Sequence, residues 1–220
     1  MKAIVFEQFG EPAEVLQVRD VPVPQPGPGQ VRVRMIASPI NPSDLLLTRG
    51  RYGFRPELPA RVGFEGVGVV DAVGPGLLGR FLKGKRVAVL NQLGGNWAEQ
   101  VVIPAKRAVP VSSRLPDEQV ASFFVNPATV LAMVRHVLAV PPGGWLVQSA
   151  ANSVLGRMII RLGRHDGFKT INLVRRPELI DELRKLGADA VLCTQDGPIE
   201  EQVRAVTGGD GALFGLDAVG

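Results

Sequence analysis

The segment of residues 145–156 constrains the fold of this chain more than any other part of its sequence. An apolar run enters a tight turn there, and the turn opens a helix. A second apolar run, residues 170–174, follows and ends in two arginines. This layout is typical of a β-α-β unit that binds a dinucleotide. The usual glycines are mostly missing, because Asn-Ser-Val at residues 152–154 occupies their place.

Strand and helix patterns alternate through the whole second half of the chain. Strands at 145–150, 169–174, 190–194 and 211–218 alternate with helices at 153–164, 177–186 and 198–206. This alternation predicts a parallel sheet with right-handed crossovers. Because a doubly wound sheet usually has about six strands, we expect a sheet truncated after its fourth strand, and we interpret the chain as the N-terminal part of a longer protein.

The first half is rich in turns and short strands. Prolines and glycines at 22–29 interrupt the chain, and strands are expected at 15–18, 30–36, 66–73, 86–90 and 97–103. The pattern predicts a small β-barrel-like domain over residues 1–116, followed by a nucleotide-binding domain over 117–220. At the junction we expect Asp117 to cap a first helix, and Pro127 to lie in the first turn of a second.

The composition narrows the class of protein. Of the 220 residues, 45% are hydrophobic and 21% charged, as in an ordinary soluble globular protein. No apolar run could span a membrane, and the N-terminus lacks the pattern of a signal peptide, so we expect a cytoplasmic protein without a membrane partner. The net charge of +4 is scattered and aromatic residues are only 5%, which argues against a nucleic-acid partner. The single cysteine, Cys193, excludes an internal disulfide.

Six short motifs carry a resemblance to a known family. They are Asn41-Pro-Ser-Asp44, Gly50-Arg-Tyr52-Gly, Pro56-Glu-Leu-Pro59, Gly63-Phe-Glu-Gly66, Asn126-Pro-Ala-Thr129 and Asn152-Ser153. With these motifs in this order, the whole chain resembles the medium-chain dehydrogenase/reductase superfamily. Within it, the chain is most similar to zinc-independent 2-enoyl thioester reductases of the mitochondrial type, and next to quinone oxidoreductases. The resemblance implies a GroES-like β domain followed by a Rossmann domain.

The resemblance also implies that catalytic zinc is absent. The zinc-dependent members hold the metal with two cysteines and the histidine of a Gly-His-Glu motif, but here Phe64 takes the histidine position and Asn41 lies in the region of the first cysteine. A catalytic zinc site needs three protein ligands. The only histidines, His136 and His165, lie on expected helices of the second half.

Tyr52, the only tyrosine of the chain, is the candidate catalytic residue. In the enoyl reductases the tyrosine of this motif is the implied proton donor. A phenol with a pKa near ~10 stays protonated at neutral pH and can donate. The alternative is a structural tyrosine whose hydroxyl is bonded to a backbone carbonyl.

The cofactor expected from the second half is NADPH. Arg175 and Arg176 follow the second strand, where an acidic residue would select NAD, and they suit a 2′-phosphate. By resemblance, Asn126 and Thr129 approach the nicotinamide end, although Asn126 could instead be a helix N-cap. Val154 stands where the reductases carry glycine, and valine disfavours a left-handed backbone. The expected cofactor-binding residues are Asn126, Thr129, Asn152, Ser153, Val154, Leu155, Arg175 and Arg176.

The resulting hypothesis is an NADPH-dependent enzyme of fatty acid metabolism that reduces the 2,3 double bond of a 2-enoyl thioester carried by coenzyme A or an acyl carrier protein. One alternative is an NADPH-dependent quinone or enone oxidoreductase. Another is an inactive nucleotide-binding fragment, motivated by the stop after the fourth strand and by Val154. A homodimer is expected from the pairing of edge strands in this family.

Overall fold

The computed structural model describes residues 1–91 and 93–219, which form two compact units. The units are Met1–Val125 and Asn126–Gly220. No helix of the described ranges is long and apolar enough to cross a membrane.

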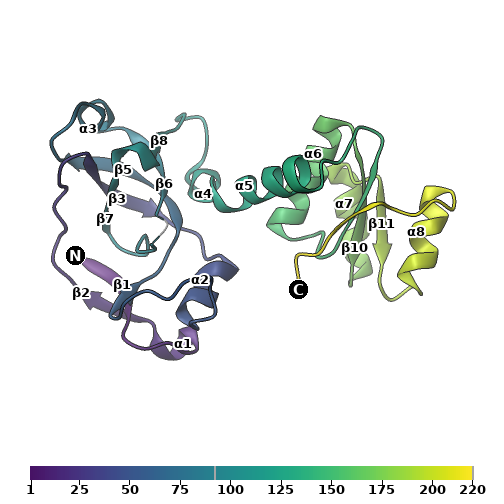
Figure 1. Cartoon of the computed structure of the whole chain (residues 1–220), viewed down its shortest axis with the longest axis horizontal. Coiled ribbons are helices and arrows are strands. Elements are labelled where there is room, and N and C mark those ends of the chain that lie inside the picture. The colour runs from purple at the N-terminus through teal and green to yellow at the C-terminus, as the bar shows by residue number, and fades with distance from the viewer. Residues whose placement is uncertain (92, 220) are drawn as a thin grey trace. The chain divides into compact units, whose positions relative to one another are not determined.

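The first unit is built on two antiparallel sheets. Val31 and Val33 are buried and alternate with Arg32 and Arg34, as the period-two pattern of this strand predicts. Figure 1 shows β3, β5 and β7 side by side in the larger sheet. That sheet has the order β7 (Gln100–Pro104), β3 (Gln30–Ala37), β5 (Glu65–Val73), β6 (Arg86–Leu90) and β8 (Ala108–Pro110). The smaller one has the order β2 (Gln17–Asp20), β1 (Lys2–Phe6) and β4 (Ala60–Arg61).

Short helices connect some of these strands along the chain. They are α1 (Pro12–Val15), α2 (Pro42–Thr48), α3 (Leu77–Leu82) and the 3₁₀ turn η1 (Ala105–Arg107). The strand expected at 15–18 therefore starts later, because Pro12 favours the first turn of a helix and α1 takes up the first of those residues.

The first unit extends beyond residue 116, where the sequence placed the domain boundary. Helix α4 (Asp117–Ala121) buries Val120 and Ala121 against Val67 and Ala88 of the large sheet. The expected N-cap is wrong: Pro116 is the cap residue, and Asp117 lies inside the helix. The Asp117 carboxylate pairs with Arg86 instead of capping the helix, and Arg86 Nη2 lies 2.5 Å from it.

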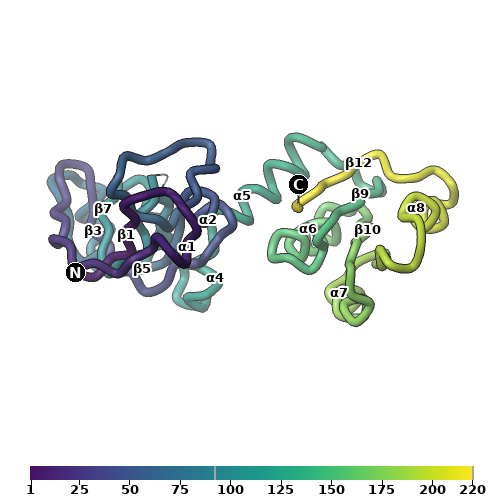
Figure 2. The backbone as a smooth tube through the Cα atoms, turned by 90° about the horizontal axis from the view of Figure 1, so that it is seen from below, coloured from purple at the N-terminus to yellow at the C-terminus, as the bar shows by residue number. Residues whose placement is uncertain are grey.

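The second unit contains the parallel sheet that the alternation predicts. The described part holds four strands in the order β11 (Ala190–Cys193), β10 (Lys169–Val174), β9 (Trp145–Gln148) and β12 (Phe214–Leu216), all parallel. They are joined by α6 (Val154–Asp166), by η3 (Pro177–Leu179) with α7 (Ile180–Leu186), and by α8 (Ile199–Thr207). Figure 2 shows the chain returning from α8 to lie beside β9 as β12.

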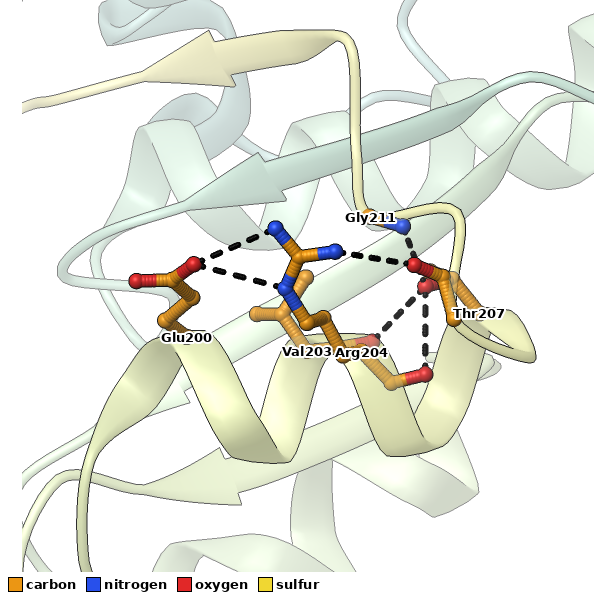
Figure 3. Close-up of polar contacts among 6 residues, drawn as sticks. Glu200, Val203, Arg204, Thr207 and Gly211 are labelled. Carbon is orange, nitrogen blue, oxygen red and sulfur yellow. Dashed lines mark hydrogen bonds and ion pairs between the residues drawn. The ribbon is translucent and has the colours of Figure 1, made fainter.

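Helix α8 and the turn after it are joined by side-chain bonds (Figure 3). Arg204 pairs with Glu200 one turn earlier, at 3.2 Å, and donates to the carbonyl of Gly209. The N–H of Gly211 donates to the hydroxyl of Thr207 at 2.8 Å. These bonds fix the turn that leads into β12.

The helix expected around Pro127 is present. It runs as α5 (Val125–Leu131) and continues as a π-helical segment, η2 (Ala132–Val137). Asn126 is its second residue, so the interpretation of Asn126 as N-cap is wrong. Pro127 still lies in the first turn, where its missing N–H costs no hydrogen bond.

One close contact sets how α6 meets the sheet. A Cβ atom on Gly156 would lie 2.5 Å from the carbonyl oxygen of Ala151 and 2.7 Å from its Cα. These are backbone atoms of the turn that leads from β9 into α6, so the turn and the helix can approach this closely only with glycine at position 156.

We expect Gly156→Ala to lower the free energy of unfolding by up to about 2 kcal/mol, because overpacking against backbone costs about 1–3 kcal/mol and the gain in helix propensity returns only about 1 kcal/mol. Urea denaturation followed by circular dichroism measures this. Gly215→Ala is the control, since its nearest neighbour would be Val147 Cγ1 at 3.8 Å. Equal stability of the two variants would contradict the conclusion that the turn and α6 need glycine at position 156.

Candidate functional site

The second unit has a cavity of about 690 Å³ at the carboxyl ends of its parallel strands. Strand order reverses between β9 and β12, and a crevice at this point is the usual ligand site of doubly wound sheets. Four loops, one after each strand, contribute to the cavity. Its lining residues are Ser149, Ala150, Ala151, Asn152, Ser153, Leu173, Val174, Arg175, Arg176, Leu179, Thr194, Gln195 and Val219.

The turn after β9 has a different strained residue from the one expected. Val154 is the first residue of α6, and no left-handed backbone is required of it. The concern over a valine at this position is therefore wrong. Ala150 has the positive φ instead, at 46°, a conformation that is rare for residues other than glycine.

Side chains of this turn are already engaged in holding its shape. Ser153 is the N-cap of α6, and its Oγ accepts from the N–H of Gly156 at 3.1 Å. Asn152 Oδ1 accepts from Arg157 at 2.9 Å. Within the described ranges, the backbone N–H groups of Val154 and Leu155 donate to no protein group. Two unpaired donors at the positive end of a helix dipole suit an anionic group.

Two arginines give the cavity a positive end. Arg175 and Arg176 directly follow β10, as predicted, and both line the cavity. Arg176 lies 3.8 Å from the carboxylate of Glu178, and both side chains are exposed. Such a pair contributes little, so its guanidinium can turn to a ligand.

The cavity does not gather every expected cofactor residue. Asn152, Ser153, Arg175 and Arg176 line it, whereas Asn126, Thr129, Val154 and Leu155 do not. The Leu155 side chain packs into the core beside α6, so only its backbone can serve a ligand. Thr194 and Gln195, which follow β11, also line the cavity and were not predicted; their place after a third parallel strand was the available signal.

Tyr52 lies in the first unit and has an unpartnered hydroxyl. Its ring is 37% exposed and packs between Phe54 and Phe64, with centroid distances of 5.6 and 5.1 Å. Among the described residues its hydroxyl has no hydrogen-bond partner, and the choice between a catalytic and a structural role for Tyr52 stays a prediction. The ring is held and the polar group stays available.

Trp97 lies beside the same aromatic group. It packs against the cluster that contains Phe64, and its Nε1 donates to the carbonyl of Pro39 at 3.0 Å. Gly63 allows this approach: it has a φ of 104°, and a Cβ there would lie 2.8 Å from the backbone nitrogen of Trp97. Trp97 also lines a separate cavity of about 410 Å³.

Beneath Tyr52 and Phe64 the first unit buries three polar side chains. Asp44 accepts from the backbone N–H groups of Asn41 at 2.7 Å and Phe64 at 3.1 Å. Asn41 Nδ2 donates to Glu65 Oε1 at 2.9 Å, and Glu65 Oε2 accepts from Phe124 N–H at 2.8 Å. Burial raises the pKa of Asp44 to about 6, against the opposing effect of its hydrogen bonds.

No metal-binding cluster occurs in this network or elsewhere in the described ranges. Asn41 and Phe64, which lie where the zinc-dependent enzymes have ligands, are occupied in packing and hydrogen bonds.

Comparisons with known proteins agree with this architecture. The profile of the alcohol dehydrogenase GroES-like domain matches residues 27–113. A mitochondrial enoyl-[acyl-carrier-protein] reductase of Xenopus tropicalis is 37% identical over 207 residues, which are 92% of this chain and 57% of that protein. The chain spans about half the length of the curated relatives it matches.

Solved structures match the whole chain. Pseudomonas syringae quinone oxidoreductase is 32% identical with a TM-score of 0.90, and the match covers 100% of this chain and 66% of that one. Escherichia coli quinone oxidoreductase, solved with NADPH, is 27% identical with a TM-score of 0.91, covering 100% and 67%. Three further solved structures are 30–34% identical, and this chain covers 67–69% of their length.

The chain belongs to the medium-chain dehydrogenase/reductase superfamily. Its fold is α/β, with a GroES-like β domain followed by a Rossmann-type parallel sheet, as the sequence predicts.

Asp44 makes stability depend on pH. Its pKa is about 6 in the folded chain against 3.8 as the ordinary value. The stabilisation is therefore complete below the lower pKa and is lost as pH rises through the higher one. We expect the free energy of unfolding to fall by up to about 3 kcal/mol across this window.

The measurement is urea denaturation of the native chain and Asp44→Asn at pH values on both sides of the window. The amide introduced at position 44 cannot titrate, so the variant should lack this slope even though it loses a backbone acceptor. Asp20→Asn, at an exposed ion pair with Lys2, is the control and should keep the native slope. Parallel pH profiles for all three proteins would refute the role of Asp44.

Proposed function

We propose that this chain provides the cofactor turn and the proton donor of a zinc-independent, NADPH-dependent reductase of 2-enoyl thioesters. The observation that carries the proposal is the hydroxyl of Tyr52, unpartnered among the described residues on a ring held by Phe64. Tyr52 is 37% exposed, so the phenol is open to a ligand. Phe64 also stands where the zinc-dependent members carry a metal ligand, so the proton chemistry falls to the phenol.

The second unit fits NADPH at the cavity below the turn after β9. The N–H groups of Val154 and Leu155, with the hydroxyl of Ser153, would hold the pyrophosphate at the start of α6. Arg175 and Arg176 would pair with the 2′-phosphate. We propose Asn126 and Thr129 for the nicotinamide end on the strength of the family resemblance.

The chemistry divides between cofactor and chain. NADPH, when bound, supplies the hydride that reduces the β-carbon of the enoyl group. Tyr52 Oη would deliver a proton to the α-carbon, and hydrogen-bond donors must meet the negative charge on the thioester oxygen. The reduction needs no metal in this scheme.

A quinone or enone reductase is the second candidate, because the matched structures include quinone oxidoreductases. Steady-state assays with crotonyl-CoA and with a simple quinone separate the two. Titration with NADPH, followed by nicotinamide fluorescence, tests the third interpretation: absence of binding would favour an inactive fragment.

We extend the proposal to a homodimer that acts in fatty acid metabolism in the cytoplasm.

We expect Tyr52→Phe to lower kcat for crotonyl-CoA by about 10²–10³-fold, since general acid catalysis contributes gains of that size. NADPH affinity should not change, because the ring and its packing on Phe54 and Phe64 are kept. Steady-state kinetics and NADPH titration measure the two effects. Unchanged enoyl reduction would show that Tyr52 is not the proton donor.

We expect the double variant Arg175→Ser/Arg176→Ser to weaken NADPH binding by about 10- to 100-fold, which corresponds to the loss of one or two charge-assisted contacts. NADH binding should change little, because NADH lacks the 2′-phosphate. Fluorescence titration with both nucleotides measures the preference. Arg204→Ser, on α8 (Figure 3), is the control and should bind both as the native chain does. An equal loss of affinity for NADPH and NADH would count against the proposal that the two arginines bind the 2′-phosphate.

A further inference from the structure

Glu65 is a fully buried carboxylate without a cation. Its side chain is 0% exposed, and no lysine or arginine in the described ranges pairs with it. We propose that Glu65 is a positioning residue that fixes the start of α5 for the reduction; this inference rests on the proposed function.

The carboxylate joins two parts of the chain that are far apart in sequence. On one side Oε1 accepts from Asn41 Nδ2 at 2.9 Å. On the other, Oε2 accepts from the backbone N–H groups of Phe124 at 2.8 Å and Val125 at 3.0 Å. Val125 is the first residue of α5. One side chain therefore connects the loop before α2 with the beginning of α5.

The cost of burying a carboxylate makes it unfavourable for the start of α5 to move. An isolated buried carboxylate is very costly, and only well-placed donors offset the cost. If the start of α5 moved away, Glu65 would lose two of its three donors in a place that water does not reach. Asp44 lies next to it and adds a second buried acid, which raises the penalty further.

The connection matters for chemistry because of what α5 carries. Asn126 and Thr129, proposed for the nicotinamide end, follow Val125 within the same helix. Phe64, which holds the ring of Tyr52, directly precedes Glu65 in the chain. Glu65 thus joins the backbone beside Tyr52 to the first residue of α5, all within the first unit.

The test exchanges the donor and the acceptor. In Glu65→Gln only one side-chain oxygen remains. If it stays with Asn41 Nδ2, the N–H groups of Phe124 and Val125 lose their acceptor; if it turns to them, two amide nitrogens face each other and force the segments apart. In Glu65→Gln/Asn41→Asp, the carboxylate at position 41 accepts from the amide at position 65. All three bonds and the net charge are then restored.

Two readouts decide the matter. Hydrogen exchange of the amides of Phe124 and Val125 should accelerate by about tenfold or more in Glu65→Gln and return toward the native rate in the double variant. The kcat for crotonyl-CoA should fall by about 10- to 100-fold in the single variant, as misplacement of a reacting group predicts. KM for NADPH should change less, because the turn after β9 and the arginines are untouched, and the double variant should recover kcat.

Glu99→Gln is the matched control. Its carboxylate also accepts from a backbone N–H, that of Lys2 at 2.8 Å, in the same unit. It should leave kcat and both amides unchanged.

Native exchange at Phe124 and Val125 in Glu65→Gln would overturn the connection. Accelerated exchange with native kcat, or restored exchange without restored kcat in the double variant, would overturn the positioning role. A native chain that binds NADPH but reduces neither crotonyl-CoA nor a quinone would refute the proposed function and with it the catalytic part of this inference, while exchange would still report on the connection itself.

Discussion

The burial of two carboxylates without a cation is the constraint on which the first unit depends. Asp44 and Glu65 can stay in the interior only because backbone N–H groups and one amide are aimed at them. Those donors come from the loop before α2, from the residue that precedes β5 and from the segment that enters α5. Each of these segments therefore has one allowed position, and the aromatic group of Tyr52, Phe54 and Phe64 is placed by it.

The second unit reaches a functional arrangement by a different route. A parallel sheet brings the carboxyl ends of all its strands to one edge, so residues distant in sequence meet in one cavity. This is why Arg175 and Arg176 could be placed from sequence alone: residues that directly follow a buried parallel strand lie at the edge of the sheet where the strands end. The same geometry brings Thr194 and Gln195 to the cavity, although no motif marks them.

Elements with a local signal were predictable, and those that depend on distant partners were not. β10 and β6 have the predicted bounds because apolar runs between turn residues determine them. The role of Asp117 was not predictable, since its partner Arg86 lies on a distant strand. Val154 was misjudged because a motif gives residue positions without the backbone angles, and the left-handed angle lies at Ala150. Glu65 carried no sequence signal beyond its motif, because its partners at Phe124 and Val125 are about sixty residues away.

Two residues of the first unit stand where the zinc-dependent members of the family carry metal ligands. Phenylalanine at position 64 removes the histidine that the zinc-dependent members use, and its ring supports Tyr52 at 5.1 Å. Asn41, in the region of the first cysteine, donates to Glu65 and so helps to satisfy a buried acid that would otherwise need a cation. The residues that replace the metal ligands thus do two jobs: one orients the candidate proton donor, and the other balances the charge that remains. Restoring a histidine at position 64 alone would therefore create no metal site, because Asn41 and Glu65 are bonded to each other and the support for Tyr52 would be lost.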